Sequence, residues 1–420
     1  MKRALVLCYD YPPDGAPGAA IRTDKLVRYL PGYGWEAQVI CHRASGGDSA
    51  LPEDSAPDGS VIRVPSSVSP RFSYQLSAWS FAWEVLPPAR AAIRARRPDV
   101  IYASCPPFPH GLSAIRLGRE FGIPVSVDLR DAWALEALLA GGWVRRLAKA
   151  ALMKWVYPGL ERILFRDAAA IITNTLEMRA AYQERYPRQA GKVHWIPNGF
   201  DEADFADAVE PPKRARPQLL YCGRFQGIAG RSPEVLLQGL RLAIDSGCDV
   251  ELRVLGDNGP RIHDCIRRLN LEAYVRAEPM VEHREAIRAM RQADLLVVYQ
   301  APTPSRVKPI AGKTFEYLRS GRPILAIVEE GANAELVRRY AVTRSVVTSQ
   351  DPQDVADALR ELLPYASQPT RLPDPEFLER YERSRIAGQI AERFAAMLGA
   401  DSAASSPVAE IETGSAIGRG

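Results

Sequence analysis

A Gly-Lys-Thr triplet stands inside PIAGKTFEYLRSGRPILAI, residues 309–327, and such a triplet ends the phosphate-binding P-loop of nucleotide hydrolases. A P-loop also needs a glycine five positions before Gly312, where this chain has Val307. The intervening residues contain a proline and no glycine. Their backbone amides therefore cannot turn around a phosphate in the Gly-rich way, and the sequence excludes a P-loop here.

The same stretch predicts a helix that begins near Lys313. Gly321 stands where helices commonly end in a left-handed residue, Pro323 prevents continuation, and residues 324–328 form a buried strand. Lys313 and Glu316 are three positions apart and share one face of this helix. Spacing alone leaves two hypotheses: a surface ion pair near a helix N-terminus, or a carboxylate that holds a nucleotide.

The composition is typical of a soluble globular protein, with 46% hydrophobic and 25% charged residues among 420. The net charge of +4 is too small to indicate nucleic acid, but it suits phosphate-rich ligands or an anionic membrane surface. The six cysteines lack C-x-x-C spacing and the five histidines form no local cluster, which favours reduced thiols in the cytoplasm and no metal. We find neither a signal peptide nor an apolar stretch of about 20 residues that could cross a membrane.

Short apolar runs alternate with helical patterns along the chain, which predicts an α/β fold with parallel sheets. We predict Rossmann-like domains over residues 1–205 and 218–375, joined by the Pro-rich linker 206–217. A helix over 376–398 is expected to cross back to the first domain, and the Ser/Ala/Gly-rich residues 400–420 are predicted to be disordered. Because ligands bind at the carboxyl ends of parallel strands, a cleft between the two sheets is the expected site.

Six segments, in this order, resemble the family 4 glycosyltransferases of the GT-B fold. They are YPPDGAPGAAIRTDKLVRYLPGYGWEAQVI at 11–40, PDVIYASCPPFPHGLSA at 98–114, IPVSVDLRDAW at 123–133, VHWIPNGFDEADF at 193–205, LLYCGRF at 219–225 and GKTFEYLRSGRPI at 312–324. The resemblance covers nearly the whole chain. It implies the GT-B architecture, two Rossmann-like domains whose parallel sheets face a central cleft.

The resemblance implies donor-binding roles in the second domain. Glu316 matches the carboxylate that accepts hydrogen bonds from the donor ribose, a diol that offers two donors to two oxygens. Arg224 matches the arginine that contacts the diphosphate, where charge develops as the bond to the sugar breaks. The lysine that usually follows this arginine is absent, so Arg231 or Lys313 is expected to supply its charge. Arg224 and Lys313 are accordingly predicted to take part in catalysis.

One position departs from the family pattern. Many relatives carry two glutamates separated by seven residues, and counting back from Glu316 leads to Lys308. The glutamate expected there usually contacts the donor sugar. We expect the segment at Ile310, Gly312 and Thr314 to contact the sugar or its phosphates instead.

The first domain supplies further candidates. Gly15 and Gly18 follow the first strand, where glycine either lets the backbone approach a diphosphate or simply permits a turn. His110 follows another strand and is predicted to orient the transferred sugar, although it could also cap a helix. Arg22, in the helix after the first strand, is an acceptor-side candidate that faces either the cleft or solvent. The charged residues Asp128, Arg130 and Asp131 end a buried strand and are further acceptor-side candidates, with an Asp–Arg structural pair as the alternative.

Two further features concern metals and membranes. The sequence contains no D-x-D triplet, so the resemblance implies a donor site without a metal and no cofactor besides the nucleotide sugar itself. GGWVRRLAKAALMKWVYPGLERILF, residues 141–165, interleaves tryptophans with basic residues. Such a helix lies on an anionic membrane, which would suit a lipid-linked acceptor, or packs its apolar face on the first domain.

The resemblance therefore implies a retaining glycosyltransferase that moves a sugar from a nucleotide diphosphate to an acceptor hydroxyl, in polysaccharide or glycoconjugate synthesis. A sugar-nucleotide 2-epimerase of the same fold and a non-catalytic nucleotide-sugar-binding subunit remain alternatives. A Rossmann-type oxidoreductase is disfavoured because no Gly-x-Gly-x-x-Gly follows the first strand. The sugar, the nucleotide base and the acceptor are not specified by these motifs.

Overall fold

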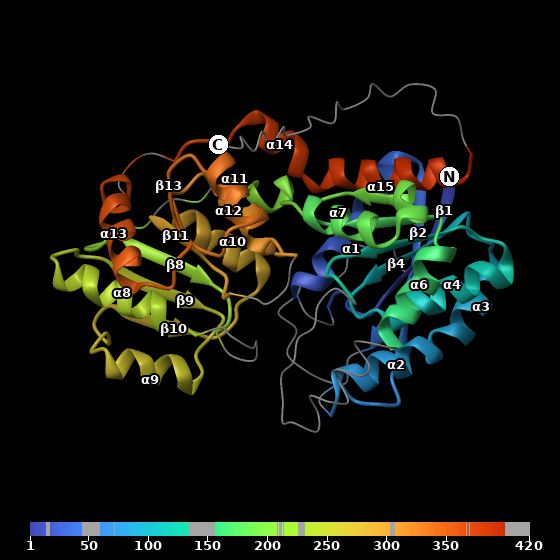
Figure 1. The fold of residues 1–420 in the computed structure, drawn as a ribbon, viewed down its shortest axis with the longest axis horizontal. Helices are drawn as coiled ribbons and strands as arrows, with labels where there is room; N and C mark the ends of the chain where they lie inside the picture. The colour runs from blue at the N-terminus through green and yellow to red at the C-terminus, as the bar shows by residue number, and fades with distance from the viewer. Residues whose placement is uncertain are drawn as a thin grey trace.

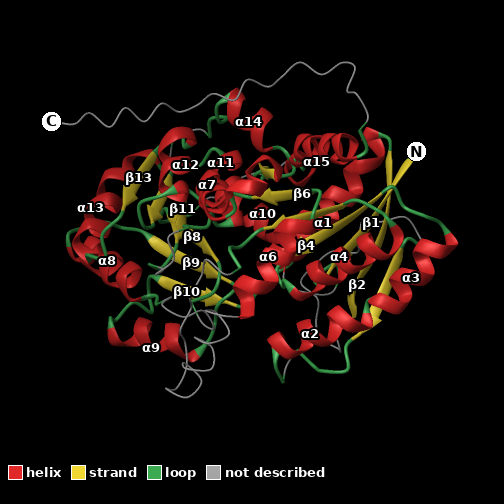
Figure 2. Cartoon of the chain, turned by 45° about the vertical axis from the view of Figure 1, so that its right-hand side comes forward, coloured by secondary structure: helices red, strands yellow, loops and turns green. Residues whose placement is uncertain are grey.

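The structure, a computed structural model, describes residues 1–13, 17–43, 59–70, 72–133, 156–207, 209, 212, 214–225, 232–302, 307–366, 368 and 370–399. It confirms the predicted α/β architecture: two parallel sheets, each covered by helices on both faces (Figures 1 and 2). Each sheet has the doubly wound strand order, in which the order reverses beside the first strand of the domain.

The N-terminal sheet has the order β3-β2-β1-β4-β5-β6-β7, and all its pairings are parallel. Its strands are β1 (Lys2–Cys8), β2 (Trp35–Arg43), β3 (Val61–Pro65), β4 (Val100–Cys105), β5 (Val125–Leu129), β6 (Ala170–Thr173) and β7 (Val193–Trp195). The helices are α1 (Pro17–Tyr29), η1 (Leu30–Tyr33), α2 (Tyr74–Glu84), α3 (Leu86–Ala95), α4 (Pro109–Phe121), α6 (Tyr157–Asp167), α7 (Leu176–Arg185), η3 (Pro187–Lys192) and η4 (Glu202–Phe205).

The C-terminal sheet has the order β10-β9-β8-β11-β12-β13 and is also parallel. Its strands are β8 (Gln218–Cys222), β9 (Glu251–Leu255), β10 (Val275–Glu278), β11 (Leu295–Tyr299), β12 (Ile324–Ile327) and β13 (Arg344–Val347). The helices are α8 (Glu234–Asp245), α9 (Pro260–Arg268), α10 (His283–Gln292), α11 (Gly312–Ser320), α12 (Ala332–Tyr340), α13 (Pro352–Leu362), η5 (Leu363–Tyr365), α14 (Pro375–Tyr381) and α15 (Arg383–Met397).

The last helix packs on the N-terminal domain, where it runs along the sheet (Figure 1). Phe394 of α15 meets the rings of Trp35 and Tyr102 at centroid distances of 5.2 and 5.7 Å. We expected one continuous helix, but the chain breaks at Glu382, whose extended backbone lets its carboxylate cap the next helix. The N-terminal core is thus completed by the end of the chain.

The crossing back to the N-terminal domain depends on a very close backbone approach. The amide of Phe200 donates to the carbonyl of Tyr381 at 3.0 Å, and the amide of Arg383 donates to the carbonyl of Phe200 at 2.8 Å. A Cβ at Gly199 would lie 1.9 Å from the Tyr381 oxygen, so only glycine fits. The Asn198-Gly199 turn therefore positions this crossing.

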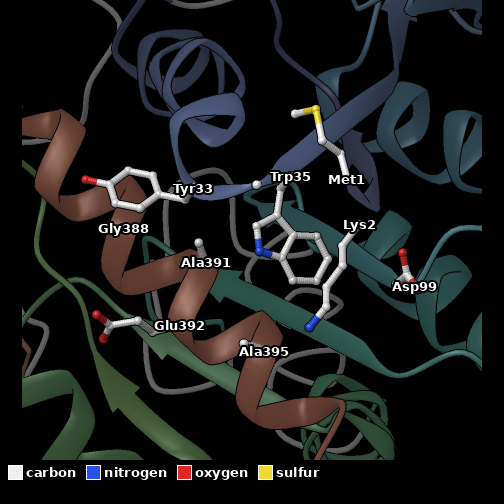
Figure 3. Close-up of a pocket in the computed structure, with 10 residues that line it drawn as sticks. Met1, Lys2, Tyr33, Trp35, Asp99, Gly388, Ala391, Glu392 and Ala395 are labelled. Atoms are coloured by element: carbon white, nitrogen blue, oxygen red, sulfur yellow. The ribbon is translucent and has the colours of Figure 1, made fainter. Parts of the chain in front are cut away.

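A surface hollow of about 680 Å³ lies between α15 and the beginnings of β1 and β2 (Figure 3). Lys2, Trp35 and Glu392 are among its lining residues, and the Lys2 Nζ stands 5.6 Å from the Trp35 ring centroid. This hollow is at the amino ends of the strands. Ligands of doubly wound sheets bind at the opposite, carboxyl ends, so the functional site is expected there.

Candidate functional site

Glu316 is held by the short helix α11, whose apolar side chains anchor it in the C-terminal core. Phe315, Tyr317 and Leu318 are almost completely buried there. Gly321 ends the helix with φ of 69°, and a Cβ there would lie 1.9 Å from the Arg371 carbonyl oxygen. The Glu316 residue is only 9% exposed, so its carboxylate needs polar neighbours.

His283, the first residue of α10, supplies the nearest of these neighbours. Its Nε2 lies 2.8 Å from Oε1 of Glu316. Burial by itself would raise the pKa of Glu316, but the His283 imidazole, with Arg383 and Lys25 farther away, lowers it below 4.5. Burial would likewise lower the pKa of His283, and the Glu316 and Asp204 carboxylates outweigh it and raise that pKa above 6.5. The arrangement favours an ionised carboxylate beside a protonated imidazole.

Lys313 and Gly223 meet at the carboxyl end of β8. The ammonium of Lys313 donates to the carbonyl oxygen of Cys222 and lies 4.0 Å from the Tyr221 ring centroid. A Cβ at Gly223 would lie 2.5 Å from that ammonium and 2.7 Å from the Tyr221 hydroxyl oxygen, so a larger residue would displace these side chains. The next residue, Arg224, is exposed, and its Nη2 lies 3.3 Å from the Met280 sulfur. Two of the predicted diphosphate-binding residues, Lys313 and Arg224, therefore lie near the carboxyl end of β8.

Thr314 fixes the segment that leads into α11. Its buried hydroxyl donates to Asn333 Oδ1 at 2.9 Å, and Asn333 Nδ2 donates to Gln300 Oε1 at 2.7 Å. Gln300 in turn donates to the Pro309 carbonyl at 2.8 Å. Thr314 thus supports the loop from inside, while Gly312 is exposed and has open space where a Cβ would lie. Ile310 packs partly buried against the C-terminal core.

Lys308, which stands where the family pattern has glutamate, is surrounded by carboxylates. Its Nζ lies 2.9 Å from Oε2 of Glu329. Its amide donates to Oε2 of Glu177 at 3.3 Å, and the amide of Ala332 donates to Oε1 of the same carboxylate at 3.0 Å. Glu177 comes from α7 of the N-terminal domain, so it joins the two domains at the start of α12.

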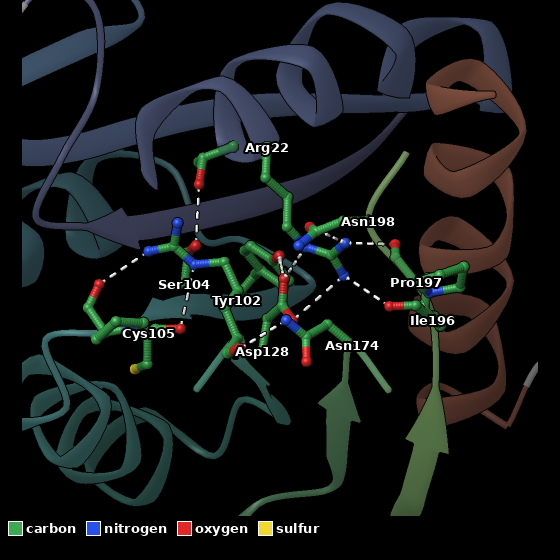
Figure 4. Close-up of polar contacts among 12 residues, drawn as sticks. Arg22, Tyr102, Ser104, Cys105, Asp128, Asn174, Ile196, Pro197 and Asn198 are labelled. Atoms are coloured by element: carbon green, nitrogen blue, oxygen red, sulfur yellow. Dashed lines mark hydrogen bonds and ion pairs between the residues drawn. The ribbon is translucent and has the colours of Figure 1, made fainter. Parts of the chain in front are cut away.

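Arg22 and Asp128 form a buried pair in the N-terminal domain (Figure 4). Arg22 Nε lies 2.7 Å from Asp128 Oδ2, and the guanidinium also donates to three acceptors in the 196–198 turn. The hydroxyl of Tyr102 donates to the same Asp128 oxygen. With both side chains at 3% exposure or less, this arrangement favours the structural alternative over contact with an acceptor.

Arg130 and Asp131, the neighbours in the same strand-end motif, differ in exposure. Arg130 is buried and donates to the carbonyls of Cys105 at 3.2 Å and Pro106 at 2.9 Å, so it braces the turn after β4. The side-chain amide of Asn174 donates to the Arg130 carbonyl at 2.6 Å. Asp131 is exposed beside this turn and is the acceptor-side candidate that solvent reaches.

His110 lies in the N-terminal core at the start of α4. It is completely buried, its Nε2 is 2.9 Å from the Ser104 carbonyl oxygen, and its ring is 5.9 Å from that of Phe81. Burial lowers the pKa of His110 from 6.5 to about 4. A neutral imidazole that donates to a backbone carbonyl is the form these contacts favour. Contact with a sugar would require this site to open.

Several residues and segments singled out in the sequence lie away from this site or outside the residues that the structure describes. Gly18 lies in the first turn of α1. Gly15, Arg231, the tail 400–420 and most of the amphipathic stretch 141–165 lie outside the described residues, and α6 covers the end of that stretch. His283 was seen in the sequence only as an isolated histidine, because 33 residues separate it from Glu316. No local spacing could have paired them.

Within the described ranges, no group of three or more histidine, cysteine or acidic residues is placed to hold a metal ion. Of the helices formed by these same residues, none is both long and apolar enough to cross a bilayer.

Two family models match the chain. Residues 17–199 match the Glycosyl transferase 4-like domain, and residues 216–364 match Glycosyl transferases group 1. No curated protein matches.

Solved structures resemble almost the whole chain. Sucrose-phosphate synthase from Thermosynechococcus elongatus has 16% identity and a TM-score of 0.63, covering 95% of each chain. Anabaena HepE in complex with UDP-glucose has 14% identity and a TM-score of 0.61, covering 94% of this chain and 100% of that one. A Listeria monocytogenes protein described as a putative UDP-N-acetylglucosamine 2-epimerase has 12% identity and a TM-score of 0.57, covering 95% and 97%. At such identities the likeness shows the fold.

Proposed function

Because the chain belongs to the group 1 glycosyltransferases of the GT-B fold, we propose that it transfers a sugar, with retention of configuration, from a nucleotide diphosphate to an acceptor hydroxyl. The observation that carries this proposal is Glu316. It is an ionised, positioned carboxylate on the second-domain helix, near the strand end that holds Lys313 and Arg224.

The ribose and the diphosphate of the nucleotide sugar each have a suitable binding residue near this strand end. The Glu316 carboxylate would accept hydrogen bonds from both hydroxyls of the ribose, since two oxygens offer about four lone-pair directions. Arg224 and Lys313 would bind the diphosphate and stabilise the charge that develops when the glycosidic bond breaks. The departing phosphate would help to deprotonate the incoming hydroxyl on the same face of the sugar. The two basic side chains would supply the positive charge that a metal ion supplies in metal-dependent transferases.

Closure of the two domains would limit hydrolysis of the donor, because water is excluded from the reacting atoms. Glu177 and the charged residues near Glu316 already join the domains. A 2-epimerase of the same fold would bind the same donor without an acceptor, and the likeness to a putative epimerase keeps this second function open. A non-catalytic subunit would bind the donor without turning it over.

An acceptor presented by a membrane has support from α2. Most of this helix is apolar around its whole circumference: Phe81 packs inward, while Phe72 just before it and Trp83 near its end are 81% and 64% exposed. Arg116 stands over the Trp83 ring at 5.6 Å, which adds a cation beside the apolar face. We therefore propose a lipid-linked acceptor and peripheral membrane contact through this face, beside the predicted contact through residues 141–165.

Calorimetric titration of the protein with a panel of nucleotide sugars tests the proposal. At least one should bind, and Glu316→Gln should weaken it by roughly 10- to 100-fold, the equivalent of one or two charge-assisted hydrogen bonds. The matched control is Glu272→Gln, a change at an exposed glutamate just after α9. Release of free nucleotide only when an acceptor hydroxyl is supplied separates a transferase from an epimerase. If no nucleotide sugar binds, the proposal fails.

A further inference from the structure

Five charged side chains form a chain of alternating sign that starts at Glu316. His283 Nε2 lies 2.8 Å from the Glu316 carboxylate, and His283 Nδ1 lies 3.8 Å from Oδ2 of Asp204. Lys25 Nζ then lies 2.7 Å from Asp204 and 2.5 Å from Asp201. Both nitrogens of one imidazole therefore face carboxylates, and both oxygens of Asp204 face cations.

This chain of charges passes from one domain to the other. Glu316 and His283 lie on α11 and α10 of the C-terminal domain, whereas Lys25 lies on α1 of the N-terminal domain. Asp204 lies in η4, the last element before the linker. The hydroxyl of Tyr29, one helical turn after Lys25, donates to Asp201 at 2.6 Å and holds the far end in place.

The low exposure of these groups makes the contacts energetically significant. The side chains of Glu316, His283 and Asp204 are 12, 15 and 20% exposed, so water screens them much less than ordinary surface pairs. The Arg319 guanidinium on α11 pairs with Glu202 of η4, which links the same two elements a second time. Glu202 is 54% exposed, so this second pair adds less than the buried contacts, but it links α11 and η4 in the same place.

We infer that His283 is a positioning residue for the donor: it fixes the Glu316 carboxylate through Nε2 and, through Asp204 and Lys25, couples donor binding to the placement of the N-terminal domain. The inference rests on the proposed role of Glu316. His283 contacts Oε1 of Glu316, and the remaining lone pairs of the carboxylate would accept hydrogen bonds from the ribose hydroxyls. Coupling of this kind is reciprocal, so a bound donor strengthens the contact between the domains.

If His283 positions Glu316, donor affinity should depend on the protonation of His283 and therefore on pH. A purely structural role would not produce this pH dependence. The groups that face the imidazole are Glu316 on α11, Asp204 in η4 and Lys25 on α1, with Arg383 at the start of α15 close to Glu316. On α10 itself the neighbouring Arg284 is paired with Asp207. Protonation of His283 strengthens both of its carboxylate contacts, so donor affinity should fall as the pH rises past the ordinary histidine range.

The experiment measures the dissociation constant of the best-binding nucleotide sugar by calorimetry between pH 6 and 8.5. We expect His283→Gln, which keeps an N–H donor but cannot take a charge, to abolish the pH dependence. His283→Ala should weaken binding roughly tenfold, the loss of about one charge-assisted hydrogen bond, and raise KM more than it lowers kcat. His263→Gln, at a partly exposed histidine on α9, is the matched control and should behave like the unaltered protein.

Asp204→Asn tests the coupling to the N-terminal domain. It should weaken donor binding and shift the pH profile although Asp204 belongs to the other domain. An unchanged profile in His283→Gln overturns the positioning role, and an unchanged affinity in Asp204→Asn overturns the coupling. If the unaltered protein binds no nucleotide sugar, the proposed function fails instead. Thermal melting of each variant identifies any that does not fold, and His283→Gln then serves in place of His283→Ala.

Discussion

His110 offers the sharpest test of how the N-terminal domain works, because its two possible roles predict opposite results for one substitution. The imidazole is buried and donates to the Ser104 carbonyl at 2.9 Å. His110→Gln keeps an amide N–H near the Nε2 position and removes the titration. If His110 is a core residue, the variant should keep its activity at neutral pH and lose a pH-dependent part of its stability. If His110 contacts the sugar, activity should fall.

The size of the pH effect follows from the burial of His110. Its pKa falls from 6.5 to about 4 on folding, so the unfolded chain takes up a proton first as the pH drops. A group whose folded pKa is lowered loses its contribution to stability as the pH falls from the unfolded value toward the folded one. Each pH unit is worth about 1.4 kcal/mol, which gives a loss of about 2 kcal/mol between pH 7.5 and 5 and about 3.4 kcal/mol in full.

Urea denaturation of the unaltered protein and of His110→Gln at pH 7.5 and 5.0 measures this effect. The free energy of unfolding should drop by about 2 kcal/mol more in the unaltered protein than in the variant. The raised pKa of His283 has the opposite effect: it stabilises the folded protein below about pH 6.5, and this stabilisation is lost at higher pH. Because His283 is present in both proteins, its contribution cancels when the two drops are compared. Equal drops in the two proteins would refute the buried-neutral assignment. A 100-fold fall in kcat at pH 7.5 would refute the core role.

Three further predictions use the same protein. Arg224→Ala should weaken nucleotide-sugar binding about tenfold in calorimetry, and Arg276→Ala, at another exposed arginine, should not; equal affinities would remove Arg224 from the donor site. Asp128→Asn should lower the free energy of unfolding in urea by about 3 to 5 kcal/mol, because it leaves the buried Arg22 guanidinium without its counter-charge; a loss below about 1 kcal/mol would contradict that reading. Trp83→Asp should reduce flotation with anionic phospholipid vesicles, and undiminished flotation would exclude the α2 face as the contact.

The alternation of apolar runs with helical patterns was sufficient to predict two parallel α/β domains, because buried strands and amphipathic helices give characteristic patterns of apolar residues. This pattern does not predict α2. Tyr74–Glu84 is apolar on both its inner and its outer face, so the polar half that marks an amphipathic helix is missing. Strand β13 was also missed: Arg344–Val347 is a partly exposed edge strand with only one fully buried residue.

The candidate site was predictable where a residue acts through its own motif and unpredictable where it acts through a distant neighbour. Glu316 follows from a local pattern, and its contact with His283 depends on how α10 and α11 pack. Arg22 and Asp128 lie 106 residues apart, so their charges suggested an exposed acceptor site until the fold placed them together. Buried ion pairs of this kind are invisible to sequence reasoning because each partner alone resembles a surface charge.

At Lys308 the chain lacks the glutamate of the family pattern, but carboxylates from other parts of the chain lie at this position. Its ammonium is 2.9 Å from the Glu329 carboxylate, and Glu177 accepts hydrogen bonds from its amide and from that of Ala332. Two carboxylates thus lie at the position where the family pattern has one: Glu329, in the loop after β12, contacts the Lys308 side chain, and Glu177, on α7, contacts its backbone amide. Because Glu177 belongs to the opposite domain, the charge balance at this end of α12 depends on the placement of that domain. The backbone of this segment is therefore held by a carboxylate of the opposite domain, while the Lys308 side chain pairs within its own domain.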